Sequence, residues 1–552
     1  MAKGYRPVDR DQPFLFPPDM REWLPGDHPV WLVIRVVEEH LDTSAFHARR
    51  KTGGAGTAGY DPDMLVTVLV WAYARGVRSS REIERLCRTG VAFRVICAGN
   101  LPDHSAVARF RAEFPAAVAG FFAQVLGLCA RLGMGRLGVV ALDGMKIAAS
   151  ASKAANRTED TLARLAREAV AAHAAADAAE DELFGAGRRG DEVPPGAWSP
   201  RRRDERIRAA LAGLEAERKA AEAAEQARAE AYRVRRAAGD RAGCPPASVA
   251  VEMAEENLAQ VRARQQAQIE VWHARNAASL AATGHPLRGC PPVPADRHCR
   301  VRQAQAKLAA TRARAAEAGR KAAEREAART GPGPVRNITD PDSRLMPVRG
   351  GGFIQGYNAQ NVTSSDGLVI ATELTDDPVD FGWFEPMLQQ AQHAAALIAA
   401  HRPAASPGQD GEPGQDGGIG RVLADAGYCS EANLTCPGPD RLIATGKGRD
   451  LEKAARDPGS GGPDRGGPAI QDMRERLATP EGIAAYRHRG HIAETPHGHI
   501  KHNMGLRQLS VRGKPKAAAE WAFAAAVHNL FKAISAGSLT SQRLTALARQ
   551  PT

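Results

Sequence analysis

The sequence predicts an α/β catalytic core that is interrupted by a long helical insertion and preceded by an all-α N-terminal domain. Short apolar, β-branched runs occur near residue 140 and again after residue 350, and helical patterns follow them. Between these runs, residues 158–330 are rich in Ala, Arg and Glu and poor in the large apolar side chains that fill a core. From Asp61 to Leu132 the apolar spacing is helical throughout.

Length, charge and cysteine usage restrict the class of protein. A chain of 552 residues is too long for one core, so several domains are expected. The net charge of +11 favours a polyanionic partner. The sequence has no signal peptide and no apolar run of about 20 residues, so we expect a cytoplasmic protein outside the membrane. Its eight cysteines lack a C-x2-C pair and are expected to be reduced thiols, with a zinc site at Cys290, His298 and Cys299 as the minor alternative.

The N-terminal domain is expected over residues 1–132. Asp61 followed by Pro62 predicts a helix start, with Asp as the N-cap and Pro at the first helical position. The helices that follow carry several arginines: Arg81, Arg85, Arg88, Arg94, Arg109 and Arg111. The pattern fits either a compact DNA-binding bundle or a helical domain whose arginines form a solvated face.

The first strand of the core is expected in residues 133–157. The apolar run Gly138 to Leu142 predicts a short buried strand that ends at Asp143. An acidic residue at a strand end can hold a metal ion, but an Asp-Gly pair is also a frequent turn.

Residues 158–330 predict an insertion of two or three long helices folded as an antiparallel, coiled-coil-like hairpin. Pro/Gly-rich breaks separate the helical blocks at GAGRRGDEVPPGAWSP, GDRAGCPPAS and GHPLRGCPPVPAD. The blocks hold no clean heptad, which indicates a weak coiled coil.

The core is expected to resume over residues 331–535, before a tail at 536–552. Two β-rich runs, FIQGYNAQNVT and GLVIATELT, flank a hairpin turn at 364–367. Asp380 precedes an amphipathic helix, and its simpler interpretation is the N-cap of that helix.

A second acidic strand end follows the low-complexity loop at 402–419. Val422 to Ala424 predict a short buried strand with Asp425 at its end and a helix that starts near Ser430. The run RLIATGK predicts one more strand. A second Gly/Pro-rich loop, residues 456–468, then leads to a helical segment.

The segment YRHRGHIAETPHGHIK places Tyr486, Arg489, Glu494 and Lys501 at the spacing Y-x2-R-x4-E-x6-K. Glu494 and Lys501 are seven residues apart, so they can share one face of a helix. Pro496 predicts that the helix begins near Glu494 or bends there.

Three carboxylates thus follow the order of a ribonuclease-H-like core: two aspartates at strand ends, Asp143 and Asp425, and Glu494 on a late helix. Three carboxylates that lie close together repel one another, but they can bind hard divalent cations such as Mg²⁺, which prefer oxygen ligands. Two ions about 4 Å apart can clamp a phosphoryl displacement. Arg489 and Lys501 would contact phosphates beside the ions or form a solvated helix face.

Several segments in order resemble the DDE-class transposases of bacterial insertion sequences, in the broad IS4/IS5 superfamily and nearest to the IS1182-type group. The similar segments are GYDPDMLVTVLVWAYARGVRSSREIERLCRTGVAFRVICAGNLPDHSAVARFR, LDGMKIAASAS, TDPDSRLM, GYNAQ, ADAGYCSEANL and the Y-R-E-K signature. The long helical segment 158–330 and the Gly/Pro-rich loops depart from the pattern without removing an acidic residue.

The resemblance implies a metal-dependent transposase that binds terminal inverted repeats, cleaves at the ends and joins the 3′-hydroxyl to target DNA. Asp143, Asp425 and Glu494 would be the catalytic residues and the ligands of two Mg²⁺ or Mn²⁺ ions. Tyr486, Arg489 and Lys501 would bind DNA phosphates. Further DNA contacts are expected from Arg81, Arg85, Arg109, Arg111 and Lys146.

The implied partners are double-stranded DNA, as transposon ends and target, and a second copy of the chain in a homodimer or larger synaptic assembly at the nucleoid. The alternative is a catalytically silent, transposase-derived DNA-binding or repressor protein, against which the intact acidic positions count.

Overall fold

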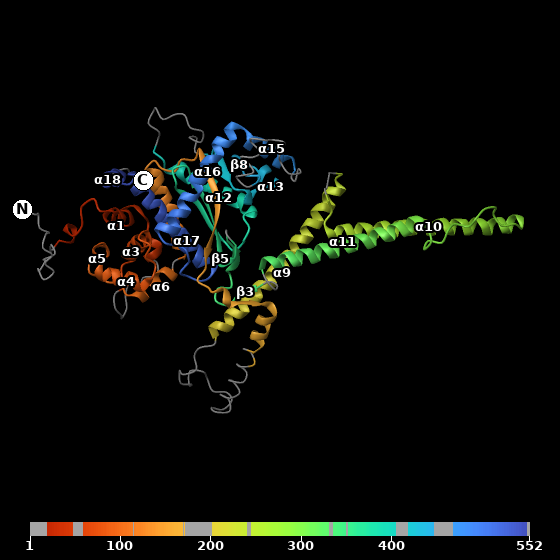
Figure 1. Cartoon of the computed structure of the whole chain (residues 1–552), viewed down its shortest axis with the longest axis horizontal. Helices are drawn as coiled ribbons and strands as arrows, with labels where there is room; N and C mark the ends of the chain where they lie inside the picture. The colour runs from red at the N-terminus through yellow and green to blue at the C-terminus, as the bar shows by residue number, and fades with distance from the viewer. Residues whose placement is uncertain are drawn as a thin grey trace, which may run out of the picture. The chain divides into compact units, whose positions relative to one another are not determined.

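The computed structural model describes residues 19–47, 59–113, 115–168, 171, 201–239, 244–330, 335–348, 351–403, 418–446 and 467–548. The chain divides into two compact units. The first comprises Met1–Ala155 and Thr339–Thr552, and the second comprises Asn156–Ile338. The fold is mixed α/β, as the sequence predicted (Figure 1).

Within the described residues, the first unit holds one six-stranded mixed sheet in the order β4-β5-β1-β7-β8, with β6 also pairing with β5. Its strands are β1 (Val139–Ala148), β4 (Arg344–Pro347), β5 (Phe353–Ser364), β6 (Val369–Thr375), β7 (Arg421–Ala424) and β8 (Asp440–Ile443). β1 runs antiparallel to β5 and parallel to β7, and β7 runs parallel to β8.

The short strands predicted around residues 422 and 442 are confirmed, and so is the hairpin between β5 and β6. Its turn uses Gly367 at φ +86°, a conformation that glycine adopts without steric cost. β1 is longer than predicted. Asp143 lies inside it rather than at its end, because pairing with β5 continues to Ala148.

The two faces of β1 belong to different hydrophobic clusters, since successive side chains of a strand alternate. Ala141 packs with Leu423 of β7 and with residues of α15 (Pro468–Ala478) and α16 (Pro480–Gly498). Val140 and Leu142 belong to the larger core cluster, to which α12 (Phe384–His401) and α17 (Lys514–Ser535) also contribute.

The N-terminal helices share that larger cluster with the sheet. They are α1 (Pro29–His40), α2 (Ser44–His47), α3 (Pro62–Ala74), α4 (Ser80–Thr89), α5 (Val91–Cys97), α6 (His104–Glu113) and α7 (Pro115–Arg131), after a short 3-10 helix, η1 (Met20–Glu22). The predicted start of α3 is confirmed, because the Asp61 carboxylate accepts hydrogen bonds from the backbone N–H groups of Asp63 and Met64. None of the described helices is long and apolar enough to cross a lipid bilayer.

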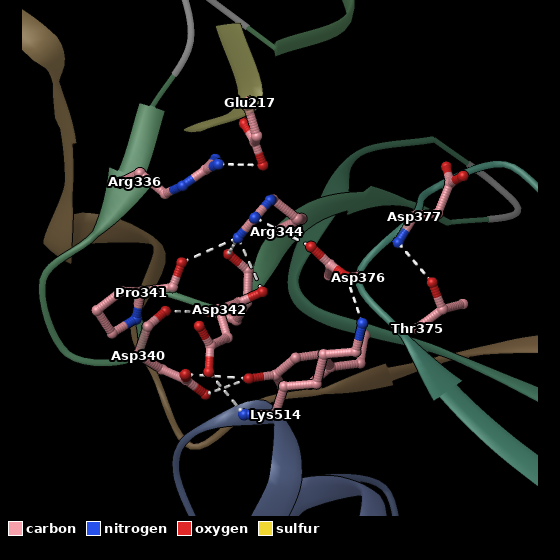
Figure 2. Close-up of polar contacts among 12 residues, drawn as sticks. Glu217, Arg336, Asp340, Pro341, Asp342, Arg344, Thr375, Asp376, Asp377 and Lys514 are labelled. Carbon is pink, nitrogen blue, oxygen red and sulfur yellow. Dashed lines mark hydrogen bonds and ion pairs between the residues drawn. The ribbon is translucent and has the colours of Figure 1, made fainter. Parts of the chain in front are cut away.

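Two buried or half-buried aspartates anchor the start of α17 to the sheet (Figure 2). The Asp340 carboxylate accepts from the Tyr357 hydroxyl of β5 at 3.0 and 2.9 Å and from the backbone N–H of Gly513, directly before α17, at 3.2 Å. The Asp376 carboxylate accepts from Lys514 Nζ at 2.8 Å and pairs with Arg344 Nη2 at 3.0 Å. The motifs TDPD and GYNAQ, which contain Asp340 and Tyr357, therefore contribute to this anchor.

The second unit contains three long helices: α9 (Arg201–Ala237), α10 (Ala247–Thr283) and α11 (Cys299–Thr330). α10 and α11 lie side by side along much of their length (Figure 1). The breaks predicted at GDRAGCPPAS and GHPLRGCPPVPAD separate these helices, and the break predicted at GAGRRGDEVPPGAWSP lies outside the described residues. A small sheet pairs β2 (Asn156–Thr158) with β3 (Val335–Asn337).

Acid is expected to destabilise the first unit through His528 of α17. Burial, with smaller contributions from nearby His499, Lys532 and His497, lowers the pKa of His528 from its usual 6.5 to about 3, although its hydrogen bond with the Gly367 backbone acts in the opposite direction. As pH falls below 6.5 the unfolded chain binds the proton first, so stability is lost between pH 6.5 and about 3, by up to about 1.4 kcal/mol per pH unit. Thermal unfolding of wild type and His528→Gln at pH 7, 6 and 5 checks this.

The wild-type Tm should fall more steeply with acid than the Tm of the variant. The amide of the substituted side chain can still donate to the Gly367 carbonyl, which lies 3.0 Å from His528 Nε2 in the wild type. His488→Gln, an exposed change on α16, is the control. Equal pH slopes for wild type and His528→Gln would contradict the assignment.

Candidate active site

Asp143 and Asp425 come together on neighbouring parallel strands. Leu142 of β1 pairs with Ala424 of β7 in the last step of their ladder, and each aspartate follows directly. Arg489 of α16 reaches both: its Nη2 donates to Asp143 Oδ1 at 2.8 Å and lies 3.7 Å from Asp425 Oδ2. The side chains of Asp143 and Arg489 are only 13% and 12% exposed, so this is a largely desolvated cluster. Asp143, Asp425 and Arg489, which the sequence predicted as site residues, therefore lie in contact in the structure.

The electrostatics of Asp425 depend on burial and on four neighbours. Burial raises the pKa of its carboxyl group, and the charges of Asp143 and Asp380 raise it further. Arg489 and a hydrogen bond from the Gly427 backbone N–H, 2.9 Å from Oδ1, oppose this rise. Carboxylates that repel one another in a desolvated site gain from an added cation.

Asp380 is a further carboxylate of this site, which the sequence interpretation missed. Its side chain makes no capping hydrogen bond to η4 (Phe381–Trp383), so the predicted N-cap role is wrong. Instead Asp380 Oδ1 accepts from Asn358 Nδ2 at 2.7 Å and Gln360 Nε2 at 2.8 Å, and Lys146 Nζ lies 3.2 Å away.

The register explains why these groups meet at Asp380. On β5, Asn358 and Gln360 are two residues apart and therefore share a face. They pair with Lys146 and Gly144 of β1. The signal in the sequence was the pair of alternating amides in GYNAQ, but only the register shows which acid they bind.

Gly144 leaves the space in which Asp380 lies. A Cβ atom at this position would lie 2.6 Å from both Asp380 Oδ1 and Gln360 Nε2. Similarly, a Cβ atom on Gly427 would lie 2.9 Å from Asp425 Oδ1 and 3.3 Å from Asp380 Oδ2. The two glycines therefore permit a close approach of the acidic groups that any larger residue would disturb.

Two tyrosines border the aspartates. The hydroxyl of Tyr486 donates to the carbonyl of Ala424 at 3.1 Å, directly before Asp425, and burial raises the pKa of Tyr486 to about 12. The hydroxyl of buried Tyr428 donates to Gln360 Oε1. Tyr486 therefore holds α16 against the end of β7 in this structure.

The structure does not bring the side chains of Glu494 and Lys501 into contact with the two aspartates. α16 begins at Pro480 with Thr479 as its N-cap, so the predicted helix start near Glu494 is wrong. The helix runs through Pro496 and continues as a π-helix, η7 (His499–Asn503), next to a proline that lacks the N–H for a regular turn. Glu494 is exposed and Lys501 half-buried, and neither side chain makes a hydrogen bond or ion pair with any other part of the described chain.

The predicted DNA-contacting cations fall into two groups. Arg81 and Arg109 are exposed, on α4 and α6. The others are engaged: Arg85 pairs with Glu82, and Lys146 pairs with Asp380. Arg111 donates to the Arg78 carbonyl at 2.7 Å and to Ser80 Oγ at 3.0 Å. In this structure Arg111 therefore orders the turn before α4.

The donor set at the aspartates suits a divalent cation. It offers carboxylate oxygens, the ligands that Mg²⁺ and Mn²⁺ prefer. Beside them the side-chain oxygen Oδ1 of Asn358 is buried without a hydrogen-bond donor among the described residues. It would lie 3.1 Å from a Cβ at Gly144 and so borders the same space. A bound cation would satisfy such an oxygen.

A second group of possible metal ligands lies in the N-terminal helices. The ligand atoms of His47, Asp61 and Asp63 all lie within 4.8 Å of one another. Their contacts have a structural explanation, because Asp61 caps α3 and His47 Nε2 lies 2.9 Å from Asp63 Oδ1. Within the described part of the chain, the group Cys290, His298 and Cys299 does not form such a cluster.

Two segments of the chain match protein-family models. Residues 18–113 match a transposase domain, DUF772, and residues 468–534 match a transposase DDE domain. The second segment spans α15 to the end of η7 and most of α17, and so contains Arg489, Glu494 and Lys501. Comparison with curated proteins and with solved structures gave no match. The two matches support a DDE transposase, whose family acts on DNA.

Proposed function

We propose that this protein is a DNA transposase of the DDE class, of the IS1182-type group in the IS4/IS5 superfamily. It binds the terminal inverted repeats of an insertion sequence, cleaves DNA at the ends and transfers the 3′-hydroxyl to target DNA. The observation that carries the proposal is the meeting of Asp143 and Asp425 at Arg489, which lies in the segment similar to a DDE domain.

The sheet supports a ribonuclease-H-like core. Two parallel neighbours, β7 and β8, lie on one side of β1, and the antiparallel hairpin β5–β6 lies on the other. This is the strand order expected when a hairpin and a helix separate the strand that carries Asp143 from the strand that ends before Asp425. The carboxylates then lie side by side on the neighbouring parallel strands β1 and β7, where metal ions could bind between them.

In this proposal Asp143, Asp425 and Glu494 hold two Mg²⁺ or Mn²⁺ ions, which when bound activate the attacking oxygen and stabilise the leaving one. Asp380 orients Lys146 and the amides of Asn358 and Gln360 beside them.

Arg489 has two competing roles. It neutralises both aspartates, and its guanidinium has the geometry to bind a phosphate in two hydrogen bonds. Its Nε is buried without a partner among the described residues. A DNA phosphate at the cluster would therefore draw Arg489 from the carboxylates, while Tyr486 keeps α16 in place and Lys501 adds a phosphate contact.

DNA binding away from the site is assigned to the N-terminal helices. Arg81 and Arg109 are exposed there, and the chain carries a net charge of +11. Binding should weaken as salt rises, because phosphate contacts release counterions. Pairing of two DNA ends requires at least a homodimer, acting at the nucleoid in the cytoplasm.

The proposal is tested with purified protein and a plasmid that carries the DNA flanking its gene on both sides. Wild type should cut at the element ends with Mg²⁺ or Mn²⁺ and should not cut in EDTA. Asp143→Asn should bind the same DNA without cutting it. Cleavage in EDTA, or by Asp143→Asn, contradicts the proposal. A gel shift with no cleavage in either metal would instead establish a catalytically silent DNA-binding protein.

A further inference from the structure

His497 is a buried imidazole next to the proposed metal site. It lies in the last turn of α16, three residues after Glu494, and is 7% exposed. Its Nδ1 lies 3.5 Å from Asp143 Oδ2. The opposite nitrogen, Nε2, is buried and has no hydrogen-bond partner within the described chain.

A structural role explains this residue poorly. A buried neutral imidazole ordinarily donates from one nitrogen and accepts at the other. Here the contact with Asp143 is long for a hydrogen bond, and Nε2 makes none. An apolar ring of similar size would fill the same volume without burying two polar nitrogens.

The distance to Asp143 instead suits two ligands of one ion. Donors that bind a metal at about 2.1 Å and at right angles lie roughly 3 Å apart. Asp143 Oδ1 is bound by Arg489, while Oδ2 is the oxygen that faces His497. The observed separation of Nδ1 and Oδ2, 3.5 Å, is close to that value.

We infer that His497 is an additional ligand of the divalent ion held by Asp143, and that it makes the site prefer Mn²⁺ and other transition-metal ions over Mg²⁺. The inference rests on the proposed function, because it requires a metal ion at Asp143. Imidazole nitrogen is a good ligand for first-row transition metals, whereas Mg²⁺ strongly prefers oxygen. The residue therefore sets metal preference at a site otherwise built of oxygen ligands.

Pulsed electron paramagnetic resonance of Mn²⁺ bound to the full-length chain tests the inference directly. A coordinated histidine nitrogen modulates the Mn²⁺ echo, and labelling with ¹⁵N-histidine changes that modulation without altering the protein. The work is done in a His47→Gln background, because the group His47, Asp61 and Asp63 could bind Mn²⁺ elsewhere. The nitrogen signal should be present in this background and absent from His497→Phe.

Mn²⁺ affinity, measured by isothermal titration calorimetry, should fall by about tenfold or more in His497→Phe, with a smaller change for Mg²⁺. His497→Gln provides a second variant of different shape should the phenylalanine disturb folding. A site that binds Mn²⁺ without a nitrogen signal overturns the His497 assignment and leaves the proposed function intact. Mn²⁺ binding that Asp425→Asn does not weaken overturns the proposed metal site itself.

Discussion

Asp425→Asn is expected to reduce cleavage at DNA ends by on the order of a thousandfold or more and to leave end binding nearly unchanged. The substitution keeps the size of the side chain and removes one negative charge. Asp425 neighbours both Asp143 and Asp380, and burial raises the pKa of its carboxyl group, so a bound cation would favour its charged form. Asparagine gives up that charge, and Arg489 then remains paired with Asp143 alone.

The measurement is a cleavage time course with a gel shift on the same DNA. Asp472→Asn is the matched control, because Asp472 is exposed on α15 and makes no ion pair within the described chain. It should cut at the wild-type rate. An Asp425→Asn protein that still cuts with Mg²⁺ removes this residue from the metal site, and one that loses DNA binding assigns it to DNA recognition.

Glu494→Gln is expected to reduce cleavage about as much as Asp425→Asn, with no change in Tm. Glu494 is exposed, so its carboxylate contributes little to folding. Its expected importance comes from position: it lies on α16 between Arg489 and His497, both of which contact Asp143. A rotation of that side chain or a shift of α16 would be needed to bring the carboxylate to the aspartates.

Asp380→Asn decides between the two possible third carboxylates. Three donors already hold Asp380, so we assign it an orienting role and expect a loss of about 10- to 100-fold. Glu481→Gln, another exposed change on α16, should have no effect. The reverse ranking, with Asp380→Asn inactive and Glu494→Gln active, would make Asp380 the third ligand. Cleavage rates and Mn²⁺ affinity together distinguish the two cases.

The sequence by itself determined the local elements. Asp61 and Pro62 start α3, Gly367 forms the turn of the β5–β6 hairpin, and Ser430 caps α13 (Glu431–Thr435). These features depend only on residues that are close in the sequence. Capping preferences and hydrophobic periodicity therefore predict them without knowledge of the fold. The approximate ends of the strands also placed Asp143 and Asp425 as candidates for one site.

Only the tertiary structure decided which charged groups share that site. Arg489 and Asp143 are 346 residues apart in the sequence. They come into contact because β1 pairs with β7 and α16 packs against these strands. Asp380 looked like a helix cap because its local sequence allows one, but the register of β5 on β1 offers it three stronger donors. Pro496 suggested a helix boundary, yet packing of Ile492 and Ala493 on the sheet carries α16 through it. Long-range packing overrides local preference in each case, since burial and charge pairing outweigh the cost of a cap or a single helical hydrogen bond.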